Sequence, residues 1–387
     1  MTQIDPLTRA EGVAPVARQF GPAADRQRHL SEEVANALAA AGLYRLAMPA
    51  EVGGEAADPL TQIRVIERIS RADGSAGWNL MIGIENFGLI APAMGACADL
   101  IADPMVVLCS STAAVGEAVA EEGGYRVSGV WQFVSGCHNS RVFGATVSVP
   151  GRRGNRYAML TPDQYEILDT WHVGGMRGSG SHDIRVRDAF VPANRIVAPL
   201  GGVKSPSPLL RFPTAARLAY NKVAIALGLG RAAIDAFLAL ADGKVPRFTS
   251  ARLRERSHAQ LALAEAEVRV VRARAALLET VGAMWAATLA EREITVRERA
   301  ILQLVCSDAV RDCVAAVELV VEAAGTSANA LEHPLERIAR DVRVVRQHVT
   351  VAAHQIVDAG RVLLGLPAQE NMLGGLPPVN RLDERDA

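Results

Sequence analysis

The hydrophobic period changes twice along this chain, and these changes limit the folds that it can adopt. From Pro15 to about Asp103 the apolar residues recur every three or four positions, which is typical of amphipathic helices. Between about Met105 and Ala198 the period is two, with β-branched and aromatic residues separated by Gly and Asn turns. Beyond this region, four long Ala-rich helices with short links predict an antiparallel bundle. The order of helices, strands and helices therefore predicts an α+β chain that is mainly α.

The same changes divide the chain into five expected segments. The third segment is rich in Gly, Ser and Pro and the last has no periodicity, which favours a linker and a tail. The last helix of the bundle is expected to run from Pro334 to Leu364. The segments are an N-terminal helical domain (1–104), a central small β-barrel or sandwich domain (105–200), a linker (201–213), a C-terminal four-helix bundle (214–365) and a tail (366–387).

Length and charge narrow the class of protein. A chain of 387 residues with 50% hydrophobic content buries a large core, and its length favours two or three domains. Because 41 Lys and Arg residues offset 42 Asp and Glu residues, no overall basic field favours a nucleic acid as partner. No cluster of His, Cys, Asp and Glu has the spacing of a zinc or iron site, so no metal is expected.

Cysteine usage and the N-terminal sequence indicate a location. The five cysteines form no Cys-x-x-Cys pair and no disulfide framework, which favours the reducing cytoplasm. The first residues show no basic region followed by an apolar run, and no segment has eighteen uninterrupted apolar residues. We therefore expect a cytoplasmic protein that is not exported and does not span a membrane.

Two motifs in the strand-rich region point to a binding site. GVWQFVSG (129–136) ends a predicted strand, and WHVGGMRGSGSHD (171–183) follows about forty residues later. A strand that ends in an aromatic residue, Ser135 and Gly136 can bring backbone donors and a hydroxyl against the edge of a flat heterocycle, because Gly lets the main chain approach closely. A flavin site needs this arrangement.

The segment WQFVSG (131–136) carries a family resemblance. Together with the other motifs, it makes the chain resemble the acyl-CoA dehydrogenase superfamily over nearly its whole length. True acyl-CoA dehydrogenases read Trp-Ile-Thr-Asn or Trp-Ile-Ser-Asn at this place. The pattern Trp-x-Phe-x-Ser-Gly is instead similar to the two-component flavin-dependent monooxygenases, the group D hydroxylases.

The resemblance implies an acyl-CoA dehydrogenase-like fold and an oxygenase activity. An oxygenase component of this branch takes reduced flavin, FMN or FAD, from a separate reductase. It forms a C4a-hydroperoxide with molecular oxygen and hydroxylates a small aromatic or heteroatom-containing substrate. The resemblance also implies a homotetramer, which extra apolar stripes on the Ala-rich helices would serve.

His348 is the strongest catalytic candidate. In the monooxygenase branch an Arg-Asp pair, here Arg340-Asp341, precedes by some seven residues a His that faces the C4a edge of the flavin. An imidazole can hydrogen-bond an oxygen adduct or accept a phenolic proton near neutral pH. Without the resemblance, a lone His on a helix is more often a packed or surface residue. Ser135 is the second candidate, at the N5 side of the flavin, although a Ser at a strand end is equally typical of a turn.

An acid that dehydrogenation would require is missing. An acyl-CoA dehydrogenase removes a proton with a carboxylate, usually on the last helical segment or on the first helix of the bundle. In this chain those positions fall at His348 or Val349 and near Tyr220 or Asn221. The absence of a carboxylate at these positions disfavours dehydrogenation. The nearest other acids are Asp358 and Glu336.

The remaining candidates are assigned by resemblance, and each has a structural alternative. Alternating aromatic residues suit a sheet core, a Gly-rich loop suits a plain hairpin, and a Gly after a helix suits a helix stop. Where many branch members have a His after the Gly-Trp pair, this chain has Asn86, which cannot act as a base. The expected cofactor-binding residues are Trp131, Phe133, Ser135, Trp171, Arg177, Ser179, Ser181, Arg247, Phe248, Thr249, Gly325 and Thr326. The expected substrate-pocket residues are Trp78, Asn86, His138 and Tyr220.

Three functions remain open from the sequence. The first is the monooxygenase, the second is an FAD-dependent acyl-CoA dehydrogenase, and the third is a flavin-binding or structural protein without turnover. Pocket selectivity comes from side chains scattered over several segments, so the sequence does not name the substrate.

Overall fold

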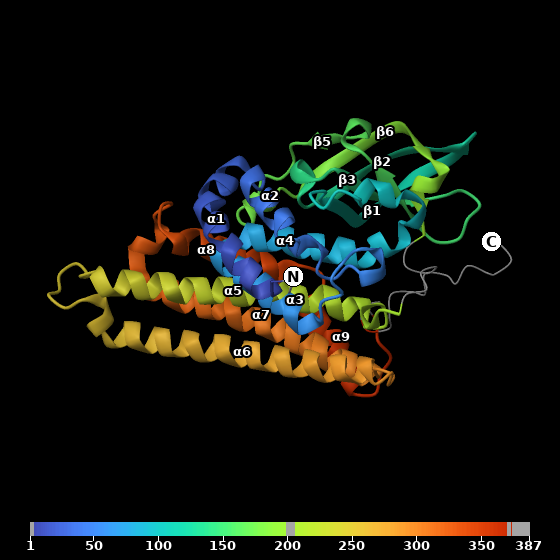
Figure 1. Cartoon of the computed structure of the whole chain (residues 1–387). Helices are drawn as coiled ribbons and strands as arrows, with labels where there is room; N and C mark the ends of the chain where they lie inside the picture. The colour runs from blue at the N-terminus through green and yellow to red at the C-terminus, as the bar shows by residue number, and fades with distance from the viewer. Residues whose placement is uncertain (1–3, 199–205, 370–372, 374–387) are drawn as a thin grey trace.

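The chain folds into N-terminal helices, a central sheet and a C-terminal helical block (Figure 1). In this computed structural model the described residues are 4–198, 206–369 and 373. The prediction of a mainly helical α+β chain with this order is confirmed. The predicted linker (201–213) and tail (366–387) lie partly outside the described residues.

Four helices form the N-terminal part. Aspartates cap the two that matter most for the site: Asp58 accepts hydrogen bonds from the first amides of α3, and Asp73 accepts one from the Ala76 amide in α4. Helix α4 is buried at nearly all positions and lies beneath the sheet, against its β1 strand (Figure 1). The helices are α1 (Pro6–Gln27), α2 (Glu32–Ala40), α3 (Pro59–Ala72) and α4 (Gly74–Leu89).

The strands form one seven-stranded mixed sheet in the order β5-β6-β2-β1-β3-β4-β7. Strands β1 and β3 pair in parallel and the other neighbours pair antiparallel. Alternating residues of these strands form a separate apolar core around Trp131 and Phe143. The strands are β1 (Leu108–Glu121), β2 (Gly124–Val134), β3 (Val142–Ser148), β4 (Arg156–Leu160), β5 (Glu166–Leu168), β6 (His182–Pro192) and β7 (Ile196–Val197).

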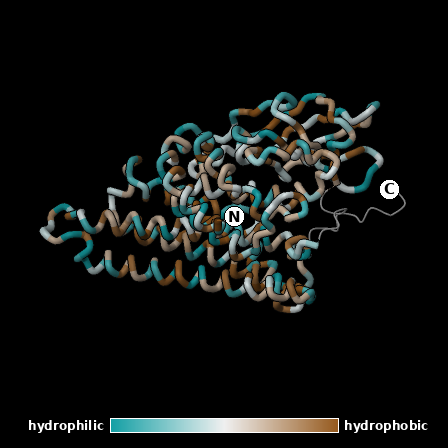
Figure 2. The backbone as a smooth tube through the Cα atoms, in the orientation of Figure 1, coloured by the Kyte–Doolittle hydropathy of each residue, from teal (hydrophilic) through white to brown (hydrophobic). Residues whose placement is uncertain are grey.

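Among the described residues the C-terminal block has five α-helices longer than one turn, and hydrophobic and hydrophilic positions alternate along them (Figure 2). Helix α5 is long and apolar enough to cross a membrane, but it packs on α3, α6, α7 and α8 and most of its side chains are buried. Its apolar character is therefore that of a core helix. The helices are α5 (Thr214–Gly243), α6 (Ser257–Leu289), α7 (Val296–Ala324), α8 (Pro334–Gln347) and α9 (Ala353–Leu363).

The prediction of one continuous helix from Pro334 to Leu364 is wrong. Helix α8 ends at Gln347, His348 has extended backbone angles (φ −66°, ψ 134°), and α9 begins at Ala353. The β-branched run Val349-Thr350-Val351 lies in the break, where side chains of this type favour non-helical backbone. His348 consequently stands at a helix end and not on a helix face.

Candidate functional site

The end of β2 is shaped by two residues in the left-handed region. Phe133 has a φ of 58° and Gly136 a φ of 76°. The register with β6 shifts between Trp131 and Val134, so Phe133 leaves the sheet as part of a bulge. A Cβ atom at Gly136 would lie 2.6 Å from Asn79 Oδ1, so this turn requires Gly for its space as well as its backbone angle.

Three serine hydroxyls meet beside this turn. Ser135 Oγ lies 2.7 Å from Ser181 Oγ, which lies 2.8 Å from Ser179 Oγ, and all three residues are buried. The Trp78 indole N–H of α4 donates to Ser135 Oγ at 3.0 Å. The structure thus brings together four residues that the sequence assigned to the site, from three distant segments.

His348 lies on the other side of Trp78. The two rings are in a T-shaped arrangement with centroids 5.6 Å apart. The Thr350 amide donates to His348 Nδ1 at 3.3 Å, so Nδ1 is an acceptor and the neutral ring carries its proton on Nε2. Within the described residues no hydrogen bond is made to Nε2, which leaves one N–H donor beside the Trp78 ring.

Burial and, to a smaller extent, the positive charge of Lys222 lower the pKa of His348 to about 3. The imidazole is therefore neutral throughout the physiological range. It can donate a hydrogen bond from Nε2 but holds no positive charge of its own.

Asp341 connects the serine loop to the helix that carries His348. The Met176 amide donates to Asp341 Oδ1 at 2.6 Å, which ties the segment before Ser179 to α8. Burial raises the pKa of Asp341 to about 7, and the nearby carboxylate of Asp73 acts in the same direction. One short helix thus positions both sides of the site.

Phe133 and Trp171 form an open aromatic edge beside the serines. Their rings are T-shaped with centroids 6.2 Å apart, Phe133 is 60% exposed and Trp171 is half-buried. Arg177 contributes differently from the expectation, since it donates to the Asp25 and Val173 carbonyl oxygens. Its guanidinium holds α1 to the loop.

Three predicted site residues have structural roles instead. Trp131 is fully buried in the sheet core and donates to the Thr146 carbonyl, so it does not wall a ligand. Asn86 bonds Leu108 O and Ser110 Oγ, which fastens α4 to β1. Tyr220 is fully buried and donates to Gln62 in α3. Each prediction relied on sequence position without knowing which way the side chain points.

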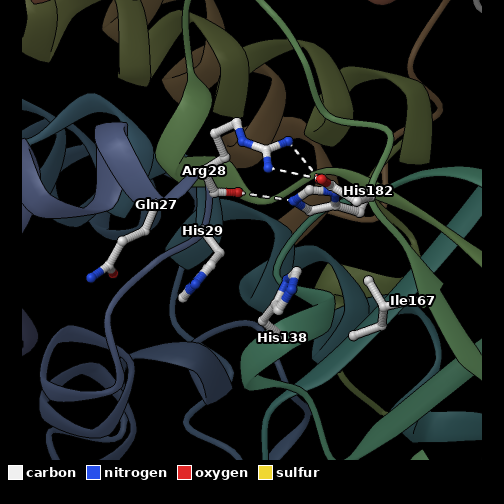
Figure 3. Close-up of a pocket in the computed structure, with 7 residues that line it drawn as sticks. Gln27, Arg28, His29, His138, Ile167 and His182 are labelled. Carbon is white, nitrogen blue, oxygen red and sulfur yellow. Dashed lines mark hydrogen bonds and ion pairs between the residues drawn. The ribbon is translucent and has the colours of Figure 1, made fainter.

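His138 belongs to a second cluster of imidazoles (Figure 3). Its ring stacks on His29 at 4.6 Å and meets the edge of His182 at 4.9 Å. Together with Arg28 and Asp169 they line a hollow of about 210 Å³ between the end of α1 and the sheet. His138, which the sequence assigned to the substrate pocket, thus lines this hollow, and no contact joins it to Trp78 or His348 among the described residues.

The expected phosphate-binding residues lie at the far end of the helical block (Figure 1). Arg247 stacks over Phe248, whose φ is 63° and whose side chain is 92% exposed, and Thr249 bonds the Pro246 carbonyl. Gly325 ends α7 with a φ of 61°, and Thr326 follows in a short 3-10 helix. Lys244 Nζ bonds Ala324 O and Ser327 Oγ, so both turns are neighbours. In this chain neither turn contacts the corner around Ser135.

The sequence reasoning missed a buried charged cluster. Lys222 Nζ lies 2.6 and 2.8 Å from the two carboxylate oxygens of Glu85, and Asn221 Nδ2 donates to Glu85 at 3.1 Å. All three residues are buried, and so is Arg217 beside them. A charged residue inside an apolar run, such as Glu85 within IGIENF, is the signal that could have found them.

Comparisons with known proteins agree with this fold. The family model for the acyl-CoA dehydrogenase N-terminal domain matches residues 9–94, and that for the C-terminal domain matches residues 221–353. Indole-3-acetate monooxygenase of Pseudomonas putida is 30% identical over 88% of this chain and 89% of its own length.

Solved structures give the same result. The HsaA monooxygenase of M. tuberculosis superposes with a TM-score of 0.84, at 26% identity, over 96% of this chain and 100% of that one. XiaF from Streptomyces sp., solved with FADH2 and glycerol, shares the fold with a TM-score of 0.84 at 23% identity, over 95% and 97% of the two chains. Fold and site together define a protein of the acyl-CoA dehydrogenase type. The chain belongs to the acyl-CoA dehydrogenase superfamily, in its branch of two-component flavin-dependent monooxygenases.

Proposed function

We propose that this protein is the oxygenase component of a two-component flavin-dependent monooxygenase. The observation that carries the proposal is the corner of Ser135, Trp78 and His348, where a neutral imidazole faces an indole that bonds the hydroxyl. Reduced FMN or FAD from a separate reductase, when bound, would supply electrons and carry oxygen to a small aromatic or heteroatom-containing substrate.

The residues present fit a flavin. Phe133 and Trp171 offer exposed aromatic surface for a flat ring, and the Ser135 hydroxyl lies beside them at the strand end. Trp78 fixes the Ser135 oxygen, because the indole N–H occupies one acceptor position. The Nε2–H of His348 would be available to donate a hydrogen bond to an oxygen of a bound ligand, and the partial burial of the ring limits the water that competes for it.

The hydrogen bonds that the candidate acids already make disfavour acyl-CoA dehydrogenation. Removing an α-proton requires a free carboxylate base. Glu85 accepts three hydrogen bonds from Lys222 and Asn221, Glu336 is bonded to Arg340, and Asp358 accepts from the Gln369 amide. Each acid is already engaged, so the imidazole is the group left to act.

We further infer that the protein works in the cytoplasm as a homotetramer. The turn with the 92% exposed Phe248 and the exposed apolar residues of α6 would be covered by neighbouring subunits. Arg247, Thr249, Gly325 and Thr326 would then reach the flavin phosphate of another subunit. The exposed residues of α6 are Leu261, Val268 and Val271.

The test is a single turnover with chemically reduced flavin. The protein is mixed with reduced FMN or FAD, ¹⁸O-labelled oxygen and a panel of phenols and indoles. We expect one labelled oxygen atom in an organic product, with the other released as water. Bleaching of bound flavin by an acyl-CoA without oxygen would establish the dehydrogenase instead, and flavin oxidation without any product would favour a homologue without turnover.

A further inference from the structure

The charged cluster behind His348 holds more positive than negative charge. Arg217 and Lys222 are 2% and 1% exposed, and the only carboxylate that acts on either of them within the described chain is Glu85. An Arg side chain stays charged in proteins, so the cluster carries one cation without a counterion. Burying an uncompensated charge is costly, so such a charge indicates a function.

Helices α4 and α5 leave space for the Arg217 guanidinium. A Cβ atom at Gly88 of α4 would lie 2.3 Å from a terminal nitrogen of Arg217 and 2.9 Å from the Ala47 Cβ, so a side chain at this position would displace the guanidinium from its present place. Arg217 therefore occupies a space that both helices provide, one turn from the Glu85–Lys222 pair.

Some buried polar groups of the cluster also lack hydrogen-bond partners. Asn221 Oδ1 is buried and has no hydrogen-bond partner, and its Nδ2 is fixed as the donor because Glu85 can only accept. Lys222 donates to the two oxygens of Glu85, and no third acceptor for its ammonium is found in the part of the chain that the structure describes. Buried polar groups normally have partners, so these atoms suit a polar ligand.

The cluster lies along the same helix faces as the corner. Trp78 and Glu85 are seven residues apart in α4, which is two helical turns or roughly 10 Å along one face. On α5, Lys222 is one turn from Leu218, whose carbonyl accepts from Thr350 beside His348. His348, at the corner end of these faces, is only partly buried.

We propose that Arg217, Lys222 and Glu85 form the acid-recognising end of the site and that the substrate is a small aromatic acid. Its carboxylate is held by the net positive charge of the cluster while its ring lies at His348. An N–H or O–H of the ligand donates to Asn221 Oδ1. This inference rests on the proposed hydroxylation, since it assigns the substrate of that same site.

A purely structural reading explains less. The Glu85–Lys222 pair alone would tie α4 to α5, although an apolar pair often serves as well. It accounts neither for Arg217, whose positive charge remains uncompensated, nor for the open oxygen of Asn221.

The test compares acids with amides of the same shape. Calorimetry at pH 7.5 measures the affinity for benzoate and benzamide, phenylacetate and phenylacetamide, and indole-3-acetate and indole-3-acetamide. We expect the acid to bind at least tenfold more tightly than its amide in at least one pair. If no pair shows this preference, or if none of the six compounds binds, the proposal is overturned.

Two variants and a control locate the preference. Arg217→Met removes the uncompensated cation and keeps the ion pair, so the preference should fall below threefold while the amide binds as before. The double variant Glu85→Gln, Lys222→Met leaves the net charge unchanged and should keep most of the preference. Arg231→Met removes a cation of the same helix that is paired with Glu267, and it should bind as the unaltered protein does. A preference that survives in Arg217→Met overturns the proposal.

These measurements do not depend on turnover. Binding without product would reject the proposed hydroxylation but not the recognition of an acid. Hydroxylation of neutral compounds, with no preference for acids in binding, would support the proposed hydroxylation and reject the recognition of an acid.

Discussion

Two histidines of this chain have lowered pKa values in different surroundings. Burial and Lys222 lower the pKa of His348 to about 3. Burial and the neighbouring rings of His29 and His182 lower the pKa of His138 to about 4. His348 stands alone with one N–H open beside Trp78. His138 lies in a stack, exposed to solvent at its rim. A lowered pKa therefore does not identify a functional histidine, whereas an open donor beside other site residues does.

The histidine stack acts as a structural contact between α1 and the sheet. His182 uses both ring nitrogens. Its Nε2 donates to the Arg28 carbonyl (Figure 3), and its Nδ1 accepts from the Thr170 and Trp171 amides. It thereby fixes the turn after α1 and the segment that leads to the serine loop. If His348 takes part in the proposed reaction and His138 only supports the fold, variants of the two residues should differ.

The largest expected effect is the loss of the His348 imidazole. His348→Asn should reduce hydroxylation in a single turnover by about 10²- to 10³-fold, because one positioned proton donor is removed. His138→Asn should reduce it less than threefold. Product is measured by mass spectrometry, with flavin binding as a control for folding. Equal losses in the two variants would mean that the stack shares in the chemistry.

The second largest effect is expected from the loss of the Ser135 hydroxyl. Ser135→Ala removes the acceptor of the Trp78 N–H and the partner of Ser181, and buried polar groups without partners cost about 1–3 kcal/mol each. We expect a loss of stability in urea together with about a tenfold fall in product formed per flavin oxidised. Ser148→Ala, at an exposed hydroxyl at the end of β3 that bonds the Gly116 carbonyl, is the control for the loss of a hydroxyl outside the corner. If the variant is as stable as the unaltered protein and forms as much product per flavin oxidised, Ser135 has no role beyond the turn.

The sequence predicted the side of the site that local motifs build. Ser135, Ser179 and Ser181 come from Gly-containing segments whose backbone requirements are visible in the sequence, and they meet as expected. Phe133 and Trp131 lie two residues apart in the same motif, but a bulge turns one outward and leaves the other in the core. The bulge depends on pairing with β6, which the motif itself does not contain.

The helical side was harder to predict. Glu85 and Lys222 are 137 residues apart, and their pairing depends on how α4 lies against α5. The break after Gln347 was also missed, because the hydrophobic period continues into α9 while the β-branched run interrupts the backbone. Local spacing predicts which elements exist, and contacts between distant elements decide which side chains meet.

The two histidines should also differ in how much each lowers the free energy of unfolding at acid pH. The folded pKa of His348 lies below its ordinary 6.5, so its contribution is complete above pH 6.5 and is lost as the pH falls toward 3, because the unfolded chain takes up the proton first. At pH 4.5 the loss is at most about 3 kcal/mol, and it is smaller because the ring is partly exposed. His348→Asn should therefore flatten the fall of unfolding free energy between pH 6.5 and 4.5. His138→Asn should flatten it less, since water screens the more exposed ring, and the reverse order would contradict the comparison.

The smallest expected effect is at the rim of the histidine stack. Asp169 pairs with Arg28 at 2.5 Å on the exposed side, and this pairing lowers the pKa of the carboxyl. Asp169→Asn should lower the melting temperature slightly at low salt and not at 1 M NaCl, because salt screens exposed charges. Hydroxylation should remain unchanged, since the stack contributes no group to the corner of Trp78 and His348. A clear loss of product at unchanged melting temperature would show that the stack does more than hold α1 against the sheet, and the division between the two histidines would fail.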